Sequence, residues 1–247
     1  MADFRPEEVL IGAIASALDG LRHVAVGASS PIPGAAALLA RSRSAGKMRV
    51  SILGSEENNF FTDGGKELFD VAGQGRIDAF FLSGAQIDGQ ANVNLVAVGD
   101  YAKPKARFPG SFGSGYLYFA VPRVILFRLE HTPRTLVEKV DFISAPGFSD
   151  DNVHRPGGPY KLITDRCLFH VDKERRCFRL ESVHPGHSVE EIHEQTGFTF
   201  ELPDGEVPTT PIPDAASLAT IRGPVAEEIA EIYPAFAVRV FGVGKAA

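Results

Sequence analysis

Apolar and polar positions along the first third of the chain alternate between helical spacing and short apolar runs. Val9, Leu10, Ala13, Ile14 and Leu18 recur at the spacing of one helix face, and Asp19-Gly20 marks the end of that helix. Short apolar runs bounded by Gly or Ser are typical of buried strands. In chain order, the pattern predicts helix 6–18, strand 23–26, helix 34–43, strand 49–53, helix 66–72 and strand 77–82.

After residue 94 the pattern changes to apolar runs with few helices between them. Strands are predicted over residues 124–129, 139–143, 160–171 and 179–183. Ser188 and Glu191 form an S-x-x-E capping box, which predicts a short helix to Gln195. Residues 150–159 are expected to form an irregular loop, 202–213 a proline-rich connector and 215–221 a last short helix.

This order of elements defines the expected fold class. Strands alternating with helices indicate an α/β fold with an open, mostly parallel sheet, to which the C-terminal half adds β-rich segments. A chain of 247 residues can form one large domain with a substantial core or two small domains. Of these, we expect a single domain over residues 1–247.

The central stretch, residues 80–115, carries the strongest candidate for a binding site. The predicted strand 77–82 ends in Ser83, Gly84, Ala85 and Gln86, and ligands in open α/β sheets lie beyond the carboxyl ends of such strands. A second cluster of small residues follows at Gly110, Gly113 and Gly115. Glycine allows backbone to approach a ligand closely, so the two clusters predict a cleft.

Composition and charge restrict the class of partner. Hydrophobic residues make up 44% and charged residues 23% of the chain, as in an ordinary soluble protein. The formal net charge of −6 argues against nucleic acid or an anionic membrane as the main partner. The start of the chain shows no signal peptide, and no apolar run is long enough to span a membrane, which predicts a cytoplasmic protein.

Cysteines and histidines give no sign of a disulfide framework or a metal site. Cys167 and Cys177 are expected to be a reduced pair, although pairing across a hairpin stays open. The histidines show no metal-binding spacing, so we predict no metal. A Ser-His-Asp triad stays open from residue types alone, but no G-x-S-x-G motif supports one.

An ordered series of motifs links the central stretch to a known family. The series is SGAQID (83–88), NVN (92–94), GDY (99–101), KPK (103–105), FPGS (108–111), VEKVDFISAPGF (137–148), LITD (162–165) and TGF (196–198). It resembles the β subunit of class I CoA-transferases, most closely the glutaconate CoA-transferase branch. The resemblance implies an α/β fold and a site shared with a separate α subunit.

In that family a glutamate of the β subunit attacks the acyl-CoA thioester and then holds CoA as an enzyme thioester. The glutamate lies at the end of the strand before the central stretch, in an ESG or SENG context. Alignment of Ser55-Glu56-Glu57-Asn58 with SENG implies Glu56 as the nucleophile, with Glu57 as the alternative. Counting from Pro31 and Gly34 instead places the position at residues 51–53, which contain no carboxylate.

The resemblance also implies roles around the cleft. Ser83, Gly84, Ala85 and Gln86 are the candidate oxyanion or substrate-binding residues, and Gly27 joins Gly110 and Gly113 as a cleft glycine. For Gln86, a substrate contact and a structural role in the loop stay equally open. Lys103, Lys105 and Arg107 form a basic cluster that is either a solvated face or a site of ion pairing to a partner or to CoA phosphates.

The expected function is CoA transfer between carboxylic acids by the β subunit of a heterodimer or heterotetramer. Its substrates would be an acyl-CoA and a small carboxylic acid, with coenzyme A bound only as a substrate and no permanent cofactor. The alternative is a subunit of an acyl-CoA hydrolase or lyase of the same fold, a ring-opening hydrolase or a decarboxylase, whose catalytic glutamate lies on the partner. A non-catalytic subunit that only shapes the CoA pocket is the third hypothesis.

Overall fold

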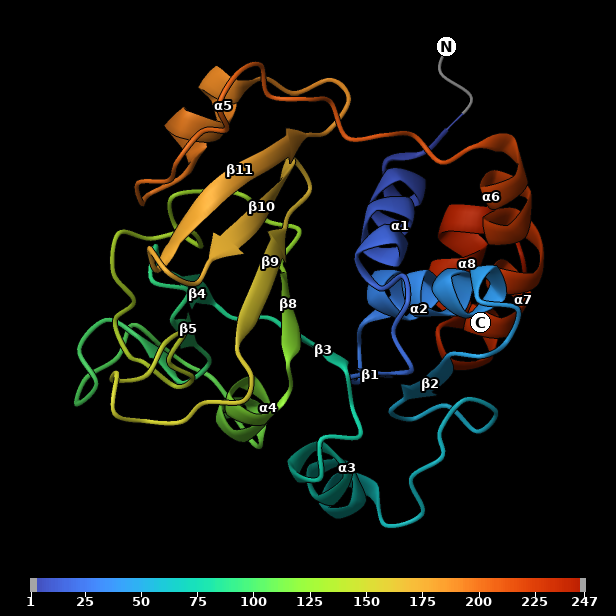
Figure 1. Ribbon diagram of the computed structural model, residues 1–247, viewed down its shortest axis with the longest axis horizontal. Helices are drawn as coiled ribbons and strands as arrows, with labels where there is room; N and C mark the ends of the chain where they lie inside the picture. The colour runs from blue at the N-terminus through green and yellow to red at the C-terminus, as the bar shows by residue number, and fades with distance from the viewer. Residues whose placement is uncertain (1–3, 245–247) are drawn as a thin grey trace. The chain divides into compact units, whose positions relative to one another are not determined.

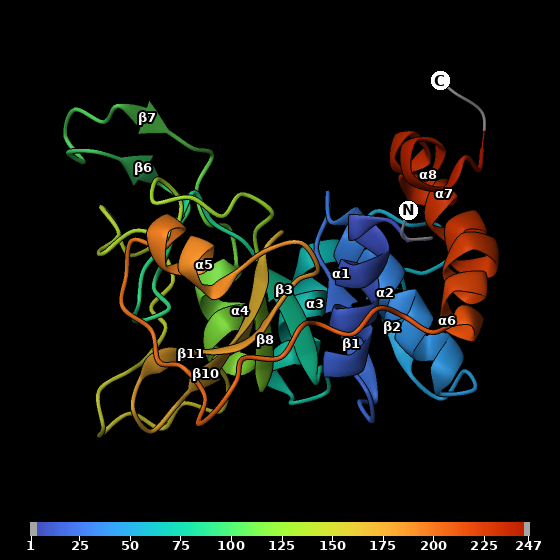
Figure 2. The ribbon, with the colours of Figure 1, turned by 90° about the horizontal axis from the view of Figure 1, so that it is seen from above.

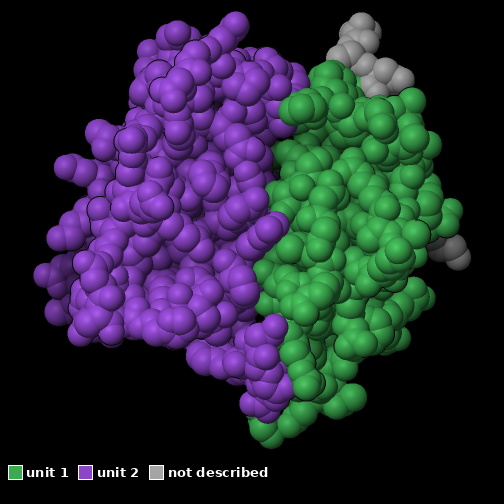
Figure 3. Space-filling view, in the orientation of Figure 1, with its two compact units in different colours: residues 1–68, 76–81, 211–247 green, residues 69–75, 82–210 purple. Residues whose placement is uncertain are grey.

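The computed structural model describes residues 4–244, which form two compact units shown in different colours in Figure 3. Unit 1 combines the chain up to Leu68 with Arg76–Phe81 and the segment from Pro211 onward. Unit 2 combines Phe69–Gly75 with Leu82–Thr210. The single domain expected from the sequence stays a prediction.

A parallel sheet forms the centre of unit 1. Strand β1 (His23–Val26) pairs in parallel with β2 (Arg49–Ile52) and with β3 (Ala79–Leu82). All four residues of β1 and all four of β3 are buried, because strands covered on both faces are apolar throughout. Helices α1 (Pro6–Ala17) and α2 (Pro31–Arg43) connect to these strands and lie side by side (Figure 1), and α3 (Gly64–Gly73) precedes β3.

The C-terminal segment adds four helical elements to unit 1: α6 (Ala215–Thr220), a π-helical turn η1 (Ile221–Val225), α7 (Ala226–Ile232) and α8 (Pro234–Phe241). The prediction that 215–221 is the last helix is therefore wrong. Pro234 occupies the first turn of α8, where its missing N–H costs nothing. Gly34 of α2 lies so close to α7 that an added Cβ would be 3.0 Å from Ile229 Cδ1.

Unit 2 contains a sheet of four strands, β8 (Arg123–Phe127), β9 (Pro159–Ile163), β10 (Cys167–Asp172) and β11 (Cys177–Val183). Strand β8 pairs in parallel with β9, whereas β10 pairs antiparallel with both β9 and β11. Buried Phe169 and Phe178, whose ring centroids are 5.8 Å apart, lie in its core. The parallel strands and the β-rich second half confirm the predicted fold class.

Short elements complete unit 2. Two antiparallel pairs of two-residue strands, β4 (Gln86–Ile87) with β5 (Val93–Asn94) and β6 (Ala97–Val98) with β7 (Ala106–Arg107), follow β3 in the chain. Helix α4 (Ser114–Ala120) precedes β8, and α5 (Val189–Gln195) follows β11. The Ser188 side chain accepts a hydrogen bond from the Glu191 N–H, which confirms the predicted cap of α5.

Two strand predictions in this unit are wrong. The predicted strand 160–171 is two strands, β9 and β10, joined by a turn at residues 164–166. Residues 139–143 form no strand, because side chains accept their N–H groups. The Val140 N–H donates to Asp88 Oδ2 and the Asp141 N–H to Gln86 Oε1.

Within residues 4–244, no helix is both long enough and apolar enough to cross a membrane.

A buried ion pair joins the two ends of the chain within unit 1. Glu8 of α1 is 1% exposed, and its carboxylate accepts Arg222 Nε at 2.6 Å, Arg222 Nη2 at 3.0 Å and the Arg5 N–H at 2.8 Å. Burial opposes ionisation of Glu8, but the bonds from Arg222 and Arg5 hold its pKa below the ordinary value. The carboxylate therefore stays charged and depends on its partners.

Replacing Arg222 by Leu is expected to destabilise unit 1 by about 3 kcal/mol, because the Glu8 carboxylate would be left buried without its main partner. The matched control is Arg239→Leu, since Arg239 pairs with the neighbouring Glu7 but is itself 65% exposed. That loss should stay below about 1 kcal/mol. Urea unfolding at pH 7 measures both, and equal losses in the two variants would contradict the prediction.

Candidate functional site

The candidate site in unit 2 begins where β3 ends. Ser83, Gly84 and Ala85 continue the chain beyond this strand, and β4 and β5 pack against them. At Gly84 an added Cβ would lie 2.6 Å from Val93 Cγ1 and 3.0 Å from the Gln86 carbonyl oxygen. Only glycine allows this close approach, so the residue type is explained by packing before any ligand is considered.

A cavity of about 490 Å³ opens beside these residues. It is lined by Ser83, Gly84, Ala85, Leu95, Val98, Ala106, Phe108, Pro109, Gly110, Arg128, Glu130, Arg134 and Thr135. Its walls are largely apolar, with a few charged groups after β8, which is the usual character of a small-molecule site. The structure thus brings together Ser83, Gly84, Ala85 and Gly110, which the sequence predicted to share a cleft.

The charged groups of the cavity are connected to one another. Arg128 Nη2 donates to Glu130 Oε2 at 2.8 Å, and Arg134 donates to Glu130 Oε1 from Nη2 at 2.6 Å and from Nε at 3.0 Å. The bonds from Arg134, with smaller contributions from Arg128 and Thr132, lower the pKa of Glu130 to about 2. Glu130 is therefore ionised, and the cluster carries one net positive charge.

Arg128 has a donor that the protein leaves unused. Its Nε is buried and has no hydrogen-bond acceptor in the described part of the chain. A buried donor without a partner costs free energy unless something else accepts its hydrogen bond. Arg128, which lines the cavity, therefore keeps one donor that no residue of the described part of the chain uses.

The backbone N–H groups of Gly84 and Ala85, both predicted to bind an oxyanion, differ in whether the protein already uses them. The Ala85 N–H donates to the Asn94 carbonyl at 2.9 Å and is already engaged. The Gly84 N–H makes no backbone hydrogen bond within residues 4–244. Of the pair, Gly84 is the one whose N–H is free to stabilise a developing oxyanion.

The side chain of Gln86 is used within the protein. Its Nε2 donates to Asp141 Oδ2 at 3.0 Å, and its Oε1 accepts from Asn94 Nδ2 at 2.8 Å and from the Asp141 N–H at 3.0 Å. Gln86 is only 6% exposed and does not line the cavity. This geometry favours a structural role for Gln86 in the loop over a contact with substrate.

Gly110 and Gly113 have different roles although they are close in sequence. Gly110 lines the cavity with a backbone φ of +110°, a conformation that favours glycine. Gly113 precedes α4, and an added Cβ there would lie 2.1 Å from the Phe69 ring. Gly113 is a packing glycine and is not among the residues that line the cavity.

In unit 1, the remaining candidates follow the carboxyl ends of two neighbouring strands. Gly27 comes after β1, and Glu56 and Glu57 are in the loop after β2. The two strands are in parallel register, with Val26 opposite Ile52. Gly27 has space around it, because an added Cβ would be 3.7 Å from Phe80 Cζ.

The loop that contains Glu56 is held in place by α7. Glu231 accepts hydrogen bonds from Ser55 Oγ at 2.6 Å and from the Glu56 N–H at 2.9 Å. Arg41 Nη1 donates to Asn58 Oδ1 at 2.7 Å at the other end of the loop. The Glu56 side chain is exposed, and its carboxylate makes no hydrogen bond or ion pair within the described residues. The loop is fixed while the carboxylate stays free.

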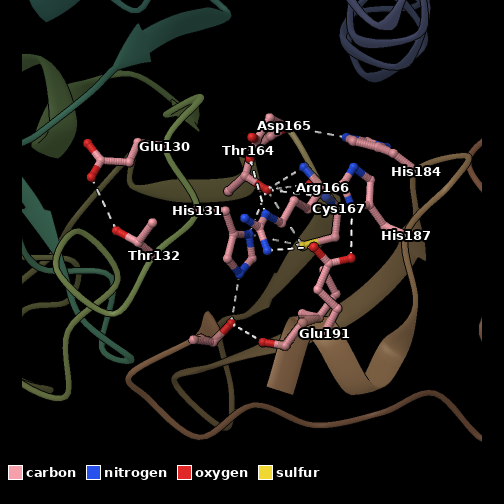
Figure 4. A network of polar contacts seen from close by, with 12 residues as sticks. Glu130, His131, Thr132, Thr164, Asp165, Arg166, Cys167, His184, His187 and Glu191 are labelled. Atoms are coloured by element: carbon pink, nitrogen blue, oxygen red, sulfur yellow. Dashed lines mark hydrogen bonds and ion pairs between the residues drawn. The ribbon is translucent and has the colours of Figure 1, made fainter. Parts of the chain in front are cut away.

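A second polar cluster lies around β10 and α5 (Figure 4). His131 is 1% exposed, and its ring nitrogens bond to Thr164 Oγ1 at 2.8 Å and to Thr196 Oγ1 at 2.9 Å. His184 bonds to Thr210 Oγ1 at 2.8 Å and to the Thr164 carbonyl at 3.1 Å. Burial lowers the pKa of each histidine to about 4, so both are neutral near pH 7. These histidines hold the core of unit 2 together.

No group of three or more metal-binding side chains occurs within residues 4–244. Cys167 and Cys177 are both free thiols, and burial raises the pKa of each. Neither cysteine therefore has the environment of an activated nucleophile.

Sequence reasoning missed Arg128, Glu130 and Arg134. The signal was available, because Arg128 lies near the end of the predicted strand 124–129, and Glu130 and Arg134 follow that strand. Charged side chains just beyond a buried strand are a recognised sign of a site in α/β folds.

Replacing Gly84 by Ala is expected to cost about 1–3 kcal/mol in stability, because the added methyl group overlaps Val93. A second change, Val93→Ala, removes the Cγ1 atom, so the double variant should lose less than the sum of the single losses. Gly27→Ala is the control and should be nearly neutral in stability. Strictly additive losses at residues 84 and 93, measured by urea unfolding, would show that the contact is not the cause.

The buried histidines predict a loss of stability in mild acid. Their folded pKa values of about 4 lie below the ordinary value of 6.5. The unfolded chain therefore binds more protons, and stability should fall as the pH drops from 6.5 towards 4. Removing one of them, as in His131→Leu, should reduce the slope in this range by up to about 1.4 kcal/mol per pH unit. Unfolding curves at a series of pH values test this, and parallel profiles for variant and wild type would refute it.

Comparison with known proteins identifies the family to which the chain belongs. Residues 12–195 match the model of the family described as coenzyme A transferase. The B-type subunit of 3-oxoadipate CoA-transferase from Pseudomonas knackmussii is 35% identical over 154 residues, which cover 60% of this chain and 58% of that protein. The B-type subunit of glutaconate CoA-transferase from Acidaminococcus fermentans is 32% identical over 149 residues, which cover 58% of this chain and 54% of that protein. The chain therefore matches little more than half the length of these relatives.

Solved structures show the same fold over nearly the whole chain. A crystal structure of glutaconate CoA-transferase from Acidaminococcus fermentans has a TM-score of 0.79 at 22% identity and covers 98% of both chains. A variant of the decarboxylase AibA/AibB has a TM-score of 0.75 at 28% identity and covers 89% of this chain and 95% of that chain. The family match, which spans well over half of the sequence, shows that this chain belongs to the coenzyme A transferase family.

Proposed function

We propose that this chain is the B-type subunit of a two-component enzyme that transfers CoA between carboxylic acids. The observation that carries the proposal is the cavity beyond β3, which combines apolar walls, the free Gly84 N–H and an unused donor of Arg128. Such a cavity suits the acyl part of a thioester whose carbonyl oxygen gains negative charge during reaction. Membership in the coenzyme A transferase family supports the same chemistry.

In the proposed mechanism Glu56 is the nucleophile, with Glu57 as the alternative. A carboxylate oxygen attacks the thioester carbonyl carbon, the C–S bond breaks, and an anhydride forms while CoA leaves as a thiolate. The thiolate then attacks the glutamyl carbonyl carbon of the anhydride and releases the first carboxylic acid. This leaves a glutamyl-CoA thioester, and a second carboxylate repeats the two steps in reverse. The free carboxylate of Glu56 on a loop held by Glu231 suits this role.

The second candidate is a subunit of an acyl-CoA hydrolase or lyase whose catalytic glutamate lies on the partner. The observation in its favour is that residues 51–53, at the end of β2, contain no carboxylate. The similar AibA/AibB protein is a decarboxylase by name. In this case the cavity would still bind an acyl-CoA, but Glu56 would be a surface acid without a covalent role.

Both candidates require further components. The relatives are named as B-type subunits, so we propose an A-type subunit as partner in a heterodimer or heterotetramer. Coenzyme A would enter as a thioester substrate together with a small carboxylic acid, with no metal and no permanently bound cofactor. We place the enzyme in the cytoplasm, where its two free cysteines would remain reduced.

Chemical trapping tests the nucleophile. After incubation of the assembled enzyme with glutaconyl-CoA or 3-oxoadipyl-CoA, hydroxylamine should convert the thioester to a hydroxamate on Glu56, located by peptide mass spectrometry. Glu56→Gln should lower kcat by at least about 10³-fold, because the group that forms the covalent bond is gone.

Glu57→Gln is the matched control, since Glu57 is an exposed acid in the same loop. Modification at residue 57 and inactivity of that variant would assign the alternative nucleophile. No modification, together with an active Glu56→Gln enzyme that cleaves acyl-CoA, would reject transfer and favour the hydrolase or lyase.

A further inference from the structure

A β-hairpin carries positive charge next to the cavity of unit 2. We call residues 97–107, which comprise β6, β7 and the turn between them, the cationic hairpin. It stands away from the main sheet of unit 2 in Figure 2. Val98 and Ala106, which lie on its two strands, line the cavity.

The charge of this region is opposite to that of the whole chain. The net charge of the protein is −6, yet no acidic residue occurs between Tyr101 and Leu129. The basic residues of the same stretch are Lys103, Lys105, Arg107, Arg123 and Arg128. Three of them lie on the cationic hairpin, and Arg128 lines the cavity. Local potential, rather than net charge, decides which ligands a cleft attracts.

The hairpin cations lie on the surface of unit 2. Lys103, Lys105 and Arg107 are exposed, and none of them forms an ion pair with another residue in the described part of the chain. Arg107 lies 4.6 Å from the centroid of the Tyr101 ring and donates to the Tyr101 carbonyl at 3.1 Å. These contacts orient the guanidinium without neutralising it.

Two acids bond to the backbone of the hairpin. Asp100, the one acid within residues 97–107, accepts the Ala102 N–H at 2.7 Å through Oδ1, and Asp141 Oδ2 accepts the Gly99 N–H at 2.8 Å. The Lys105 N–H also donates to the Val98 carbonyl at 2.8 Å. A supported turn thus presents three cations against the two carboxylates that hold it.

The spacing along the hairpin suits a ligand that is apolar at one end and anionic at the other. Lys105 is adjacent in sequence to Ala106 of the cavity wall, and Lys103 lies in the turn that joins the two strands, where its N–H donates to the Asp100 carbonyl. A molecule that fills the apolar cavity with its reacting end can therefore reach these cations with its other end. Lysine ammonium groups suit phosphate oxygens, which they bind as point charges.

We propose that Lys103, Lys105 and Arg107 of the cationic hairpin bind the phosphates of coenzyme A while the cavity takes the acyl end of the thioester. The inference rests on the proposed function and adds the phosphate site to it.

Binding of three probes to the purified chain tests the site by calorimetry: coenzyme A, 3′-dephospho-CoA and pantetheine, which has no phosphate. We expect affinity to fall in that order, and to fall for coenzyme A as salt is raised from 50 to 300 mM, because screening weakens exposed ion pairs. Lys103→Gln combined with Lys105→Gln should weaken coenzyme A binding about three- to thirtyfold and leave pantetheine binding unchanged. The matched control is Lys47→Gln with Lys173→Gln, two exposed lysines outside the hairpin.

The outcomes separate this inference from the proposed function. Coenzyme A binding that is equally strong in the hairpin variant and insensitive to salt would overturn the phosphate site and leave the CoA-dependent function standing. A wild-type chain that binds none of the probes would count against both. A hairpin variant that binds coenzyme A normally but no longer assembles with its partner would assign the hairpin to protein docking and also overturn the inference. The salt dependence is measured on the wild type, so it does not depend on the folding of any variant.

Discussion

A hydrogen-bonded network of three side chains holds the segment on which the site of unit 2 depends. Gln86 bonds to both Asn94 and Asp141, and Asn94 Nδ2 also donates to the Ala97 carbonyl at 2.6 Å. Asp141 further accepts the Gly99 N–H at 2.8 Å. Gln86 and Asn94 are 6% and 0% exposed, so their amides need these partners in place of water. Through this network, the base of the cationic hairpin and the segment that follows β3 are held in one arrangement.

The network also explains why the segment after β3 has so little regular secondary structure. Asp88 accepts the N–H groups of Gln90 and Asn92 at 3.0 Å each, and of Val140 at 3.3 Å. Each such bond replaces one that a strand would otherwise make in a ladder. The sequence pattern predicts a strand over 139–143, and that pattern contains no information about which side chain will accept each N–H. This error therefore arises from contacts between residues far apart in the chain, as in the bond between Asp141 and Gln86 over 55 positions.

Local patterns predicted the elements of the first third of the chain closely, because buried parallel strands and capped helices have strong local signals. Strand β1 has the predicted bounds, and α1 ends one residue early. Helices α7 and α8 were missed although Val225, Ile229, Phe236 and Val240 are buried at helical spacing. Pro224 lies in a π-helical turn and Pro234 in the first turn of a helix, so neither proline prevents helical structure. The close association of Ser83, Gly84, Ala85 and Gly110 followed from the strand end and the glycines, whereas the charged groups after β8 were missed although they stand near the end of a predicted strand.

The distribution of charge along the chain explains how a protein with a net negative charge can present a positively charged site to an anionic ligand. A net charge of −6 disfavours polyanions, which contact a large area of a protein surface. A single small anion is affected mainly by charges within about 8–10 Å, the screening length at physiological salt. The hairpin and the cavity wall present Lys103, Lys105, Arg107 and Arg128, with Glu130 already bonded to two arginines. Asp100 and Asp141, which accept N–H groups of the hairpin, keep their own negative charge, but the three cations of the hairpin outnumber these two acids. A net negative charge on the whole chain is therefore compatible with a local group of cations beside the cavity.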